Sequence, residues 1–155
     1  MIEPGQPRLL LLNGPNLNML GRRDPGHYGT FTLADAEQLA RDAAAEAGFT
    51  LDCYQTNHEG DMLEKIHAAM DHYRGLLINA GAWTHTSYAL RDALELTRLP
   101  VMEIHISDVQ HREAFRRVSV IEDVCMGKTA GLGLDSYRVA TEKMCAYLRS
   151  LEYGR

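Results

Sequence analysis

Short apolar runs alternate along the chain with longer segments in which apolar residues recur every three to four positions. The runs predict strands at residues 8–13, 49–54, 75–79 and 101–106, with a weaker strand at 124–130. The segments between them predict helices, because this spacing places apolar side chains on one helical face. Strands that are apolar on both faces, each followed by a helix, indicate an α/β fold with a parallel sheet covered on both sides.

Local signals predict where the helices begin and end. Thr32 precedes one helix and Asp35 follows three residues later, as in a capping box, and Gly48 ends that helix. Ser87 is expected to cap another helix, and Pro100 ends that unit. Apolar residues recur at helical spacing in each of the four predicted helices. The first three helices carry Ala36, Leu39, Ala40, Ala43 and Ala47, then Leu63, Ile66, Met70 and Tyr73, and then Leu90 and Leu94. The last helix is expected to bury Tyr137, Ala140, Met144, Leu148 and Leu151.

Polar residues cluster where three of the predicted strands end. The clusters are Asn13-Gly14-Pro15-Asn16, Asn79-Ala80-Gly81 and Glu103-Ile104-His105-Ile106-Ser107. In parallel sheets, ligands bind at the carboxyl ends of the strands. We therefore expect these three segments to build a common site.

Composition narrows the class of protein. The 155 residues suit a single domain spanning 1–155, and a net charge of -5 argues against a nucleic-acid partner. Cys53, Cys125 and Cys145 are odd in number and lack CxxC spacing, which favours reduced thiols and a cytoplasmic protein over a disulfide framework or a zinc site. The sequence has no signal-peptide pattern and no apolar run near the roughly 20 residues of a membrane span.

Two nucleotide-binding patterns fail on inspection. Gly127-Lys128-Thr129 is similar to the end of a phosphate-binding loop, but Glu122 occupies the position of its first glycine. Gly131-Leu132-Gly133 is similar to part of a dinucleotide fingerprint, but Ser136 occupies the third glycine position. His58-Glu59 lacks the second histidine of a zinc protease. None of these three patterns therefore indicates the site that it is similar to.

The strand at 101–106 carries the sharpest chemical signal. Glu103, His105 and Ser107 alternate with apolar residues, so all three side chains are expected on one face. A carboxylate next to an imidazole fixes its tautomer and favours its protonated form, which suits a general acid. A buried structural histidine is the alternative interpretation of the same pattern.

Two further segments carry candidate chemistry. Residues 20–29 place Arg22, Arg23 and Tyr28 between glycines, which suits a mobile lid in which the arginines favour the phenolate; a solvated basic loop is the alternative. Residues 79–87 join a strand end to a helix start, where amide groups can bind hydroxyls or a carboxylate. Farther along, Arg112 and Arg116 lie one helical turn apart and suit a small anion.

Four blocks of the sequence together resemble the type II 3-dehydroquinate dehydratase family. The first comprises Leu12-Asn13-Gly14-Pro15-Asn16-Leu17, Leu20-Gly21-Arg22-Arg23 and Tyr28-Gly29, and the second is Gln55-Thr56-Asn57-His58-Glu59-Gly60. The third runs from Asn79 to Asp92 and contains Thr84-His85-Thr86-Ser87; the fourth comprises Glu103-Ile104-His105-Ile106-Ser107, Arg112 and Phe115-Arg116-Arg117. The blocks keep the family's order and run over nearly the whole chain.

The resemblance implies a flavodoxin-like fold with a parallel five-stranded sheet, no cofactor, no metal, and a homododecamer built from trimers. It also implies dehydration of 3-dehydroquinate to 3-dehydroshikimate by anti elimination through an enolate. Tyr28 would remove the C2 proton, Arg23 would hold the phenolate, and Asn16 would position a water that stabilises the enolate. His105, supported by Glu103, would protonate the departing C1 hydroxyl.

The same resemblance assigns the substrate-binding residues. Asn79, His85, Asp92 and Arg116 would contact substrate hydroxyls or line their pocket. The backbone of Ile106 and the side chain of Ser107 would bind the carboxylate, and Arg112 would shape this pocket.

The sequence departs from the family pattern in two segments. Asp108 stands where an asparagine is usual and adds negative charge beside the carboxylate site, whereas Val118-Ser119-Val120 replaces His-Ser-Tyr near where subunits of the family meet. Two alternatives therefore stay open: a sister dehydratase acting on a related hydroxy-ketone carboxylate, and a non-catalytic binding protein on the same scaffold. Lys65, Lys128 and Lys143 lie outside the predicted site loops, which argues against a Schiff-base mechanism.

Overall fold

Every strand of the central sheet lies parallel to its neighbours in the computed structural model, which describes residues 5–153. The strands are β1 (Arg8–Asn13), β2 (Thr50–Gln55), β3 (Gly75–Asn79), β4 (Val101–Ile104) and β5 (Gly127–Thr129). Their order across the sheet is β2-β1-β3-β4-β5. This is the flavodoxin-like order, and it confirms the predicted five-stranded α/β fold.

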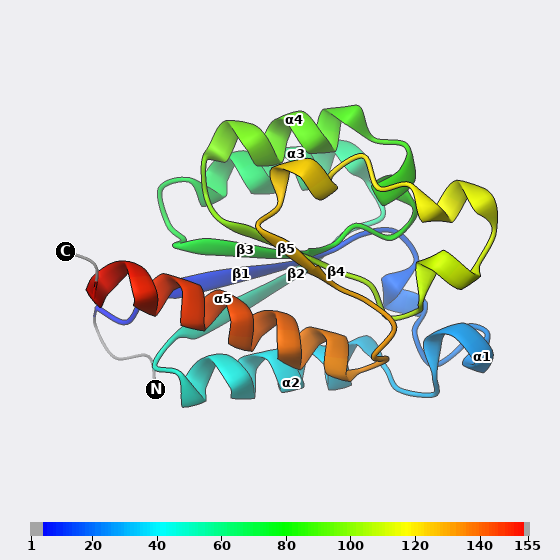
Figure 1. The fold of residues 1–155 in the computed structure, drawn as a ribbon, viewed down its shortest axis with the longest axis horizontal. Helices are drawn as coiled ribbons and strands as arrows, with labels where there is room; N and C mark the ends of the chain where they lie inside the picture. Colours follow the sequence, from blue (N-terminus) through cyan, green and yellow to red (C-terminus); the bar gives the residue numbers. More distant parts are fainter. Residues whose placement is uncertain (1–4, 154–155) are drawn as a thin grey trace.

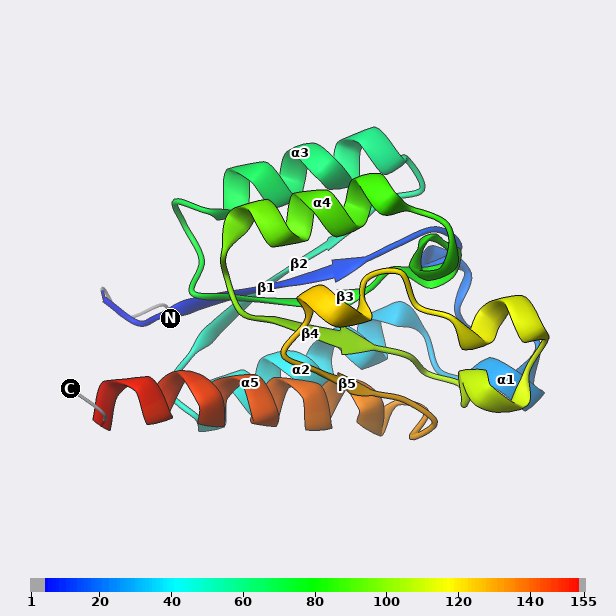
Figure 2. The same ribbon diagram turned by 45° about the horizontal axis from the view of Figure 1, so that its top comes forward.

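Two pairs of helices cover the sheet (Figures 1 and 2). Helices α2 (Leu33–Glu46) and α5 (Asp135–Tyr153) lie on one face, and α3 (Glu59–Ala69) and α4 (Tyr88–Thr97) lie on the other. The short helix α1 (Pro25–Tyr28) lies at the end of the sheet where the strands finish. The 3-10 turns are η1 (Leu17–Met19), η2 (Gly81–His85), η3 (Val109–His111), η4 (Ala114–Arg117) and η5 (Glu122–Val124).

Strand β1 shows why its sequence reads as a continuous apolar run. Leu9 and Leu11 pack into the cluster beneath α2 and α5, whereas Leu10 and Leu12 pack into the cluster beneath α3 and α4. All four side chains are fully buried, and each such burial contributes about 1.5–3 kcal/mol. A strand covered on both faces therefore needs no alternating polar positions.

The predicted signals at both ends of α2 and at the start of α4 are confirmed. Thr32 Oγ1 accepts a hydrogen bond from the Asp35 amide at 3.3 Å, and Asp35 Oδ2 accepts one from the Thr32 amide at 2.9 Å, which completes the capping box. Ser87 Oγ accepts from the Leu90 amide at 3.0 Å and caps α4. Gly48 follows α2 with φ of +85°, a conformation that favours glycine.

Several expected boundaries and core positions were wrong. Strand β4 ends at Ile104 rather than at 106, and β5 spans only 127–129, with Val124 in the preceding turn η5. Helix α3 ends at Ala69, and its buried stripe consists of Met62, Ile66 and Ala69, so Met70 lies outside this stripe and is exposed. Leu151 is also exposed, because the last turns of α5 extend past the sheet (Figure 1). Leu39 and Ala47 are half-buried, and Tyr73 lies beyond α3.

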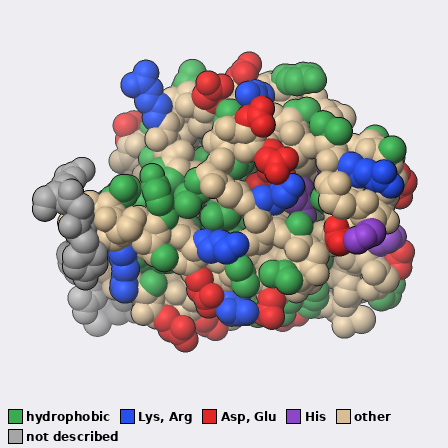
Figure 3. Space-filling view, viewed as in Figure 1, with side chains coloured by type: hydrophobic (Ala, Val, Ile, Leu, Met, Phe, Trp, Pro, Cys, Tyr) green, Lys and Arg blue, Asp and Glu red, His purple; other side chains and the backbone are tan. Residues whose placement is uncertain are grey.

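The surface in Figure 3 carries basic and acidic side chains that are interspersed rather than gathered into one charged field. No helix within residues 5–153 is long and apolar enough to cross a membrane. Cys53, Cys125 and Cys145 are all free thiols. Burial raises the pKa of Cys125 to about 12 and that of Cys145 to about 11. These two thiols are therefore held in their neutral form.

Candidate functional site

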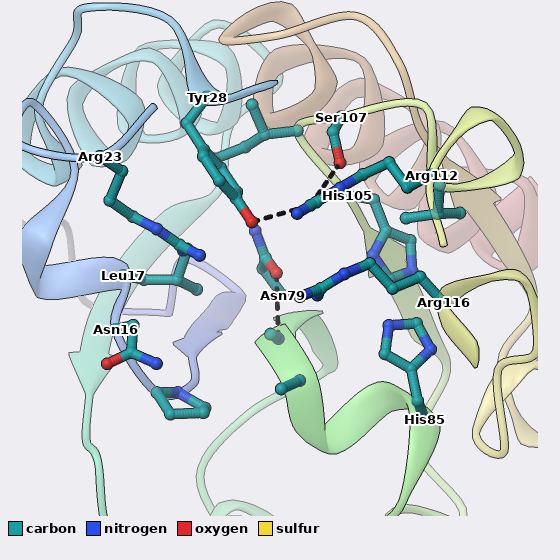
Figure 4. Close-up of a pocket in the computed structure, with 15 residues that line it drawn as sticks. Asn16, Leu17, Arg23, Tyr28, Asn79, His85, His105, Ser107, Arg112 and Arg116 are labelled. Atoms are coloured by element: carbon teal, nitrogen blue, oxygen red, sulfur yellow. Dashed lines mark hydrogen bonds between the residues drawn. The ribbon is translucent and has the colours of Figure 1, made fainter. Parts of the chain in front are cut away.

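One pocket opens at the carboxyl ends of β1, β3 and β4, where the polar clusters were expected to meet (Figure 4). It encloses about 590 Å³ of empty space, including open solvent at its mouth. The predicted site residues that line it are Asn16, Arg23, Tyr28, Asn79, His85, His105, Ile106, Ser107, Arg112 and Arg116. Residues from five separate segments of the chain therefore converge on one cavity.

The close approach of two loops forms the floor of this pocket. The Gly14 amide donates to the Asn79 carbonyl at 2.8 Å, and a Cβ at Gly14 would lie 2.5 Å from the Ala80 carbonyl oxygen. Only glycine fits this contact. Asn16 then adopts φ of +69°, a left-handed conformation that asparagine tolerates, and its amide donates to Asn57 Oδ1 at 2.9 Å. The side chain of Asn57 thus supports the loop that carries Asn16.

Tyr28 lies at the end of α1 with only 9% of its surface exposed. The Arg23 guanidinium carbon lies 3.7 Å from the ring centroid of Tyr28. Arg112 Nη1 donates to Tyr28 Oη at 2.7 Å and to Ser107 Oγ at 3.3 Å. The prediction of Arg22 as the second arginine beside the phenol was wrong, because Arg22 is exposed and Arg112 takes that place.

His105 and Glu103 form a buried pair on the opposite side of the pocket. Glu103 is completely buried on β4, and its Oε2 accepts a hydrogen bond from His105 Nε2. His105 lines the pocket and is 6% exposed. The predicted alternation is therefore confirmed for this pair. With Nε2 held by the carboxylate, Nδ1 is the ring nitrogen that can serve the pocket.

His85 lines the pocket as a neutral hydrogen-bond acceptor. Its Nδ1 lies 2.8 Å from the Val118 carbonyl oxygen, which can only accept, so Nδ1 carries the proton and Nε2 has a free lone pair. Burial lowers the pKa of His85, and the positive charge of Arg116 acts in the same direction. Since Val118 holds His85 through its backbone, the side-chain change at this position leaves the contact in place.

A buried hydrogen-bond chain orients Asn79 from below. Tyr137 Oη on α5 donates to Asn13 Oδ1 at 2.7 Å and accepts from Asn79 Nδ2 at 3.0 Å. Asn79 Oδ1 accepts from the Gly81 amide at 3.2 Å, so both ends of its amide group are fixed. Burial raises the pKa of Tyr137. Sequence reasoning placed Tyr137 only in the core; the signal was a hydroxyl on an otherwise apolar stripe.

Three predicted features lie outside the pocket lining or at its rim. Asp92 is exposed on α4 and does not line the pocket. Asp108 also lies outside the lining, and its Oδ2 pairs with His111 Nδ1 at 2.5 Å. Arg116 lines the pocket and forms an ion pair with Glu113. Within residues 5–153, no group of three or more His, Cys, Asp or Glu side chains is arranged to hold a metal ion.

Comparison with known proteins shows which family the chain is similar to. The family described as dehydroquinase class II matches residues 7–145. The 3-dehydroquinate dehydratase 2 of Pseudomonas putida is 48% identical over 144 residues, covering 93% of this chain and 97% of the relative. The 3-dehydroquinate dehydratase of Synechococcus is 49% identical over 145 residues, covering 94% and 99%.

A solved structure with a similar sequence has the same fold. The type II dehydroquinase from Butyrivibrio crossotus superposes with a TM-score of 0.86 at 40% identity, covering 90% of this chain and 97% of that one. The match of the family over 139 residues, the identity to named relatives and this superposition agree with one another. The chain therefore belongs to the class II dehydroquinase family.

Proposed function

We propose that this protein dehydrates 3-dehydroquinate to 3-dehydroshikimate by anti elimination through an enolate. The observation that carries the proposal is a phenol beside two arginines facing a carboxylate-bound imidazole across one pocket. The names of the relatives support the same reaction. Such an elimination needs a base and an acid with opposite charge preferences, and this pocket holds one candidate for each.

Tyr28 is the proposed base. As phenolate it takes the C2 proton of the substrate, and the guanidinium groups of Arg23 and Arg112 stabilise its negative charge. A proton next to a ketone is weakly acidic, so the enolate needs hydrogen-bond donors where its charge develops. Asn16, at the rim of the pocket, is proposed to hold a water in that position.

His105 is the proposed acid. Hydroxide is a poor leaving group, so the C1–O bond breaks as the imidazolium delivers its proton and water departs. Glu103 holds the imidazole and compensates its charge. The electrons of the broken C2–H bond form the new C1–C2 double bond, and Tyr28 and His105 then exchange their protons with solvent.

The remaining lining residues are proposed to bind the substrate. The Ile106 backbone and the Ser107 side chain hold the carboxylate, with Arg112 beside them. Asn79, Arg116 and the free Nε2 of His85 contact the hydroxyls, His85 as an acceptor. Neither Asp108 nor Val118 lines the pocket, so we prefer 3-dehydroquinate over a related hydroxy-ketone carboxylate.

We also propose the homododecamer built from trimers, in the cytoplasm. On α4, Tyr88 and Leu96 are 68% and 60% exposed, and Asp92 lies between them on the same helical face. An apolar face of this kind suits contact with another copy, and we propose that Asp92 contacts the substrate at such an interface. Leu96→Asp is expected to lower the sedimentation coefficient; a monomeric wild-type protein would remove the assembly from the proposal.

The activity is tested by mixing purified protein with 3-dehydroquinate and following the ultraviolet absorbance of the conjugated enone. Tyr28→Phe is expected to lose roughly 100-fold or more of the rate, because a general base contributes about that much. Its fold should persist, since Arg112 keeps its contact with Ser107. Tyr73→Phe, which loses a hydrogen bond to Asp52 far from the pocket, is the matched control and should stay active. No enone at high wild-type concentration would refute the proposal.

A further inference from the structure

Three consecutive residues, 118–120, lie outside the pocket lining and form hydrogen bonds with residues of the proposed site and its supporting turn. The Val118 carbonyl accepts from His85, as described above, and the Val120 amide donates to the Thr84 carbonyl at 2.8 Å. Between them, Ser119 Oγ donates to Glu103 Oε1 at 3.2 Å. This segment therefore contacts both halves of the site: the turn that carries His85 and the carboxylate behind His105.

The direction of the Ser119 hydrogen bond follows from counting donors and acceptors. A serine hydroxyl has one proton and two lone pairs. Ser119 Oγ already accepts from the Ile121 amide at 3.3 Å and from the Glu122 amide at 3.1 Å, which uses both lone pairs. Its proton is directed to Glu103 Oε1. Because His105 donates to Oε2, each oxygen of this fully buried carboxylate has its own donor.

We propose that Ser119 is a positioning residue for the acid: it holds Glu103 through Oε1, so that Oε2 stays aimed at His105 while the imidazole delivers its proton. This inference rests on the proposed role of His105. A buried carboxylate oxygen without a donor is costly, so a carboxylate that lost Ser119 would rotate to share its remaining donor between both oxygens. The imidazole would then lose its fixed orientation toward the leaving hydroxyl.

The other titratable groups around this pair are already engaged or neutral. His85 faces both His105 and Glu103, and its lowered pKa keeps it uncharged. Cys125 faces Glu103 as a neutral thiol, since its pKa is about 12. Lys128 is the register partner of Glu103 on β5, but its Nζ pairs with Glu122 at 2.9 Å. Among the residues that the structure describes, Ser119 and His105 are thus the two side chains that donate a hydrogen bond to the Glu103 carboxylate.

The test compares Ser119→Ala with Ser119→Thr, which keeps the hydroxyl. We expect Ser119→Ala to lower kcat by about tenfold, the effect of losing one hydrogen bond to a charged group, with KM within about twofold. The alkaline limb of the kcat profile, which reports the acid, should move to higher pH, because an anion with fewer donors retains the imidazole's proton more strongly. Ser119→Thr should stay within about threefold of wild type, as its donor is kept.

A double-mutant cycle separates positioning from a general loosening of the segment. If Ser119 acts through Glu103, Ser119→Ala should have little further effect on kcat in a Glu103→Gln background. Three results would each overturn the inference. They are an equal loss of kcat in both backgrounds, an alkaline limb that does not move, and equal losses of kcat in the Ala and Thr variants when both fold by circular dichroism. Full activity of Glu103→Gln and His105→Ala would instead refute the proposed acid, which is a different outcome.

Discussion

The hydroxyl of Tyr137 offers a sharp test of how the core supports the pocket. Tyr137→Phe removes one oxygen atom and keeps the ring, which is completely buried, so packing stays nearly unchanged. The hydroxyl lies between Asn13 and Asn79, register partners at the ends of the neighbouring strands β1 and β3. Its loss would leave Asn13 Oδ1 and Asn79 Nδ2 without this partner.

The expected cost follows from the burial of these two groups. A buried polar group left unpaired costs about 1–3 kcal/mol. Asn13 is fully buried and its Nδ2 already has no partner within residues 5–153, so its side chain would lose the hydrogen bond that it has. Asn79 lines the pocket and can regain a water. We therefore expect a total loss of about 2 kcal/mol, most of it from Asn13.

Urea unfolding at one fixed protein concentration measures this loss, and steady-state kinetics measure its effect on the pocket. KM should rise, because Asn79 would no longer be held for the substrate. Thr141→Val is the matched control: Thr141 Oγ1 donates only to the Tyr137 carbonyl, at 2.8 Å, and should affect stability without affecting KM. A loss below about 0.5 kcal/mol together with an unchanged KM would refute the reasoning, since a satisfied buried pair cannot be removed so cheaply.

Three further predictions concern single residues of the site. Glu103→Gln keeps shape but removes the charge that compensates the imidazolium, so kcat should fall by about 100-fold, and a change below threefold would contradict the acid pair. Gly14→Ala forces a Cβ against the Ala80 carbonyl and should cost about 1–3 kcal/mol in urea unfolding; wild-type stability would show that the loops can separate freely. The pKa of His85 is lowered in the folded protein, so the unfolded chain binds more protons than the folded chain once the pH falls below the ordinary value of 6.5. The free energy of unfolding is therefore at its full value above that pH and decreases as the pH drops through the folded-state pKa. Unfolding midpoints of His85→Gln against pH should lack this decline, and an identical decline in both proteins would assign it elsewhere.

Much of the architecture could be predicted from the local sequence. Thr32 and Asp35 mark a helix start by a pairing that needs only four consecutive residues, and the structure contains both of its hydrogen bonds. The apolar run of β1 predicted a strand buried on both faces, since each residue alternates between two layers of helices. The contact between Glu103 and His105 was also predictable, because residues two apart on a strand share a face.

Element ends and cross-chain contacts needed the tertiary structure. Met70 continues the helical spacing of α3, yet it is exposed, because the helix ends at Ala69 and buries that residue in its last turn instead. The second arginine on Tyr28 comes from 84 residues away, and the hydroxyl that holds Asn79 from 58 residues away. The spacing of residues along one strand or helix determines which face a side chain occupies. Which side chains meet across the pocket depends on how separate elements pack, and periodicity within one element carries no information about that.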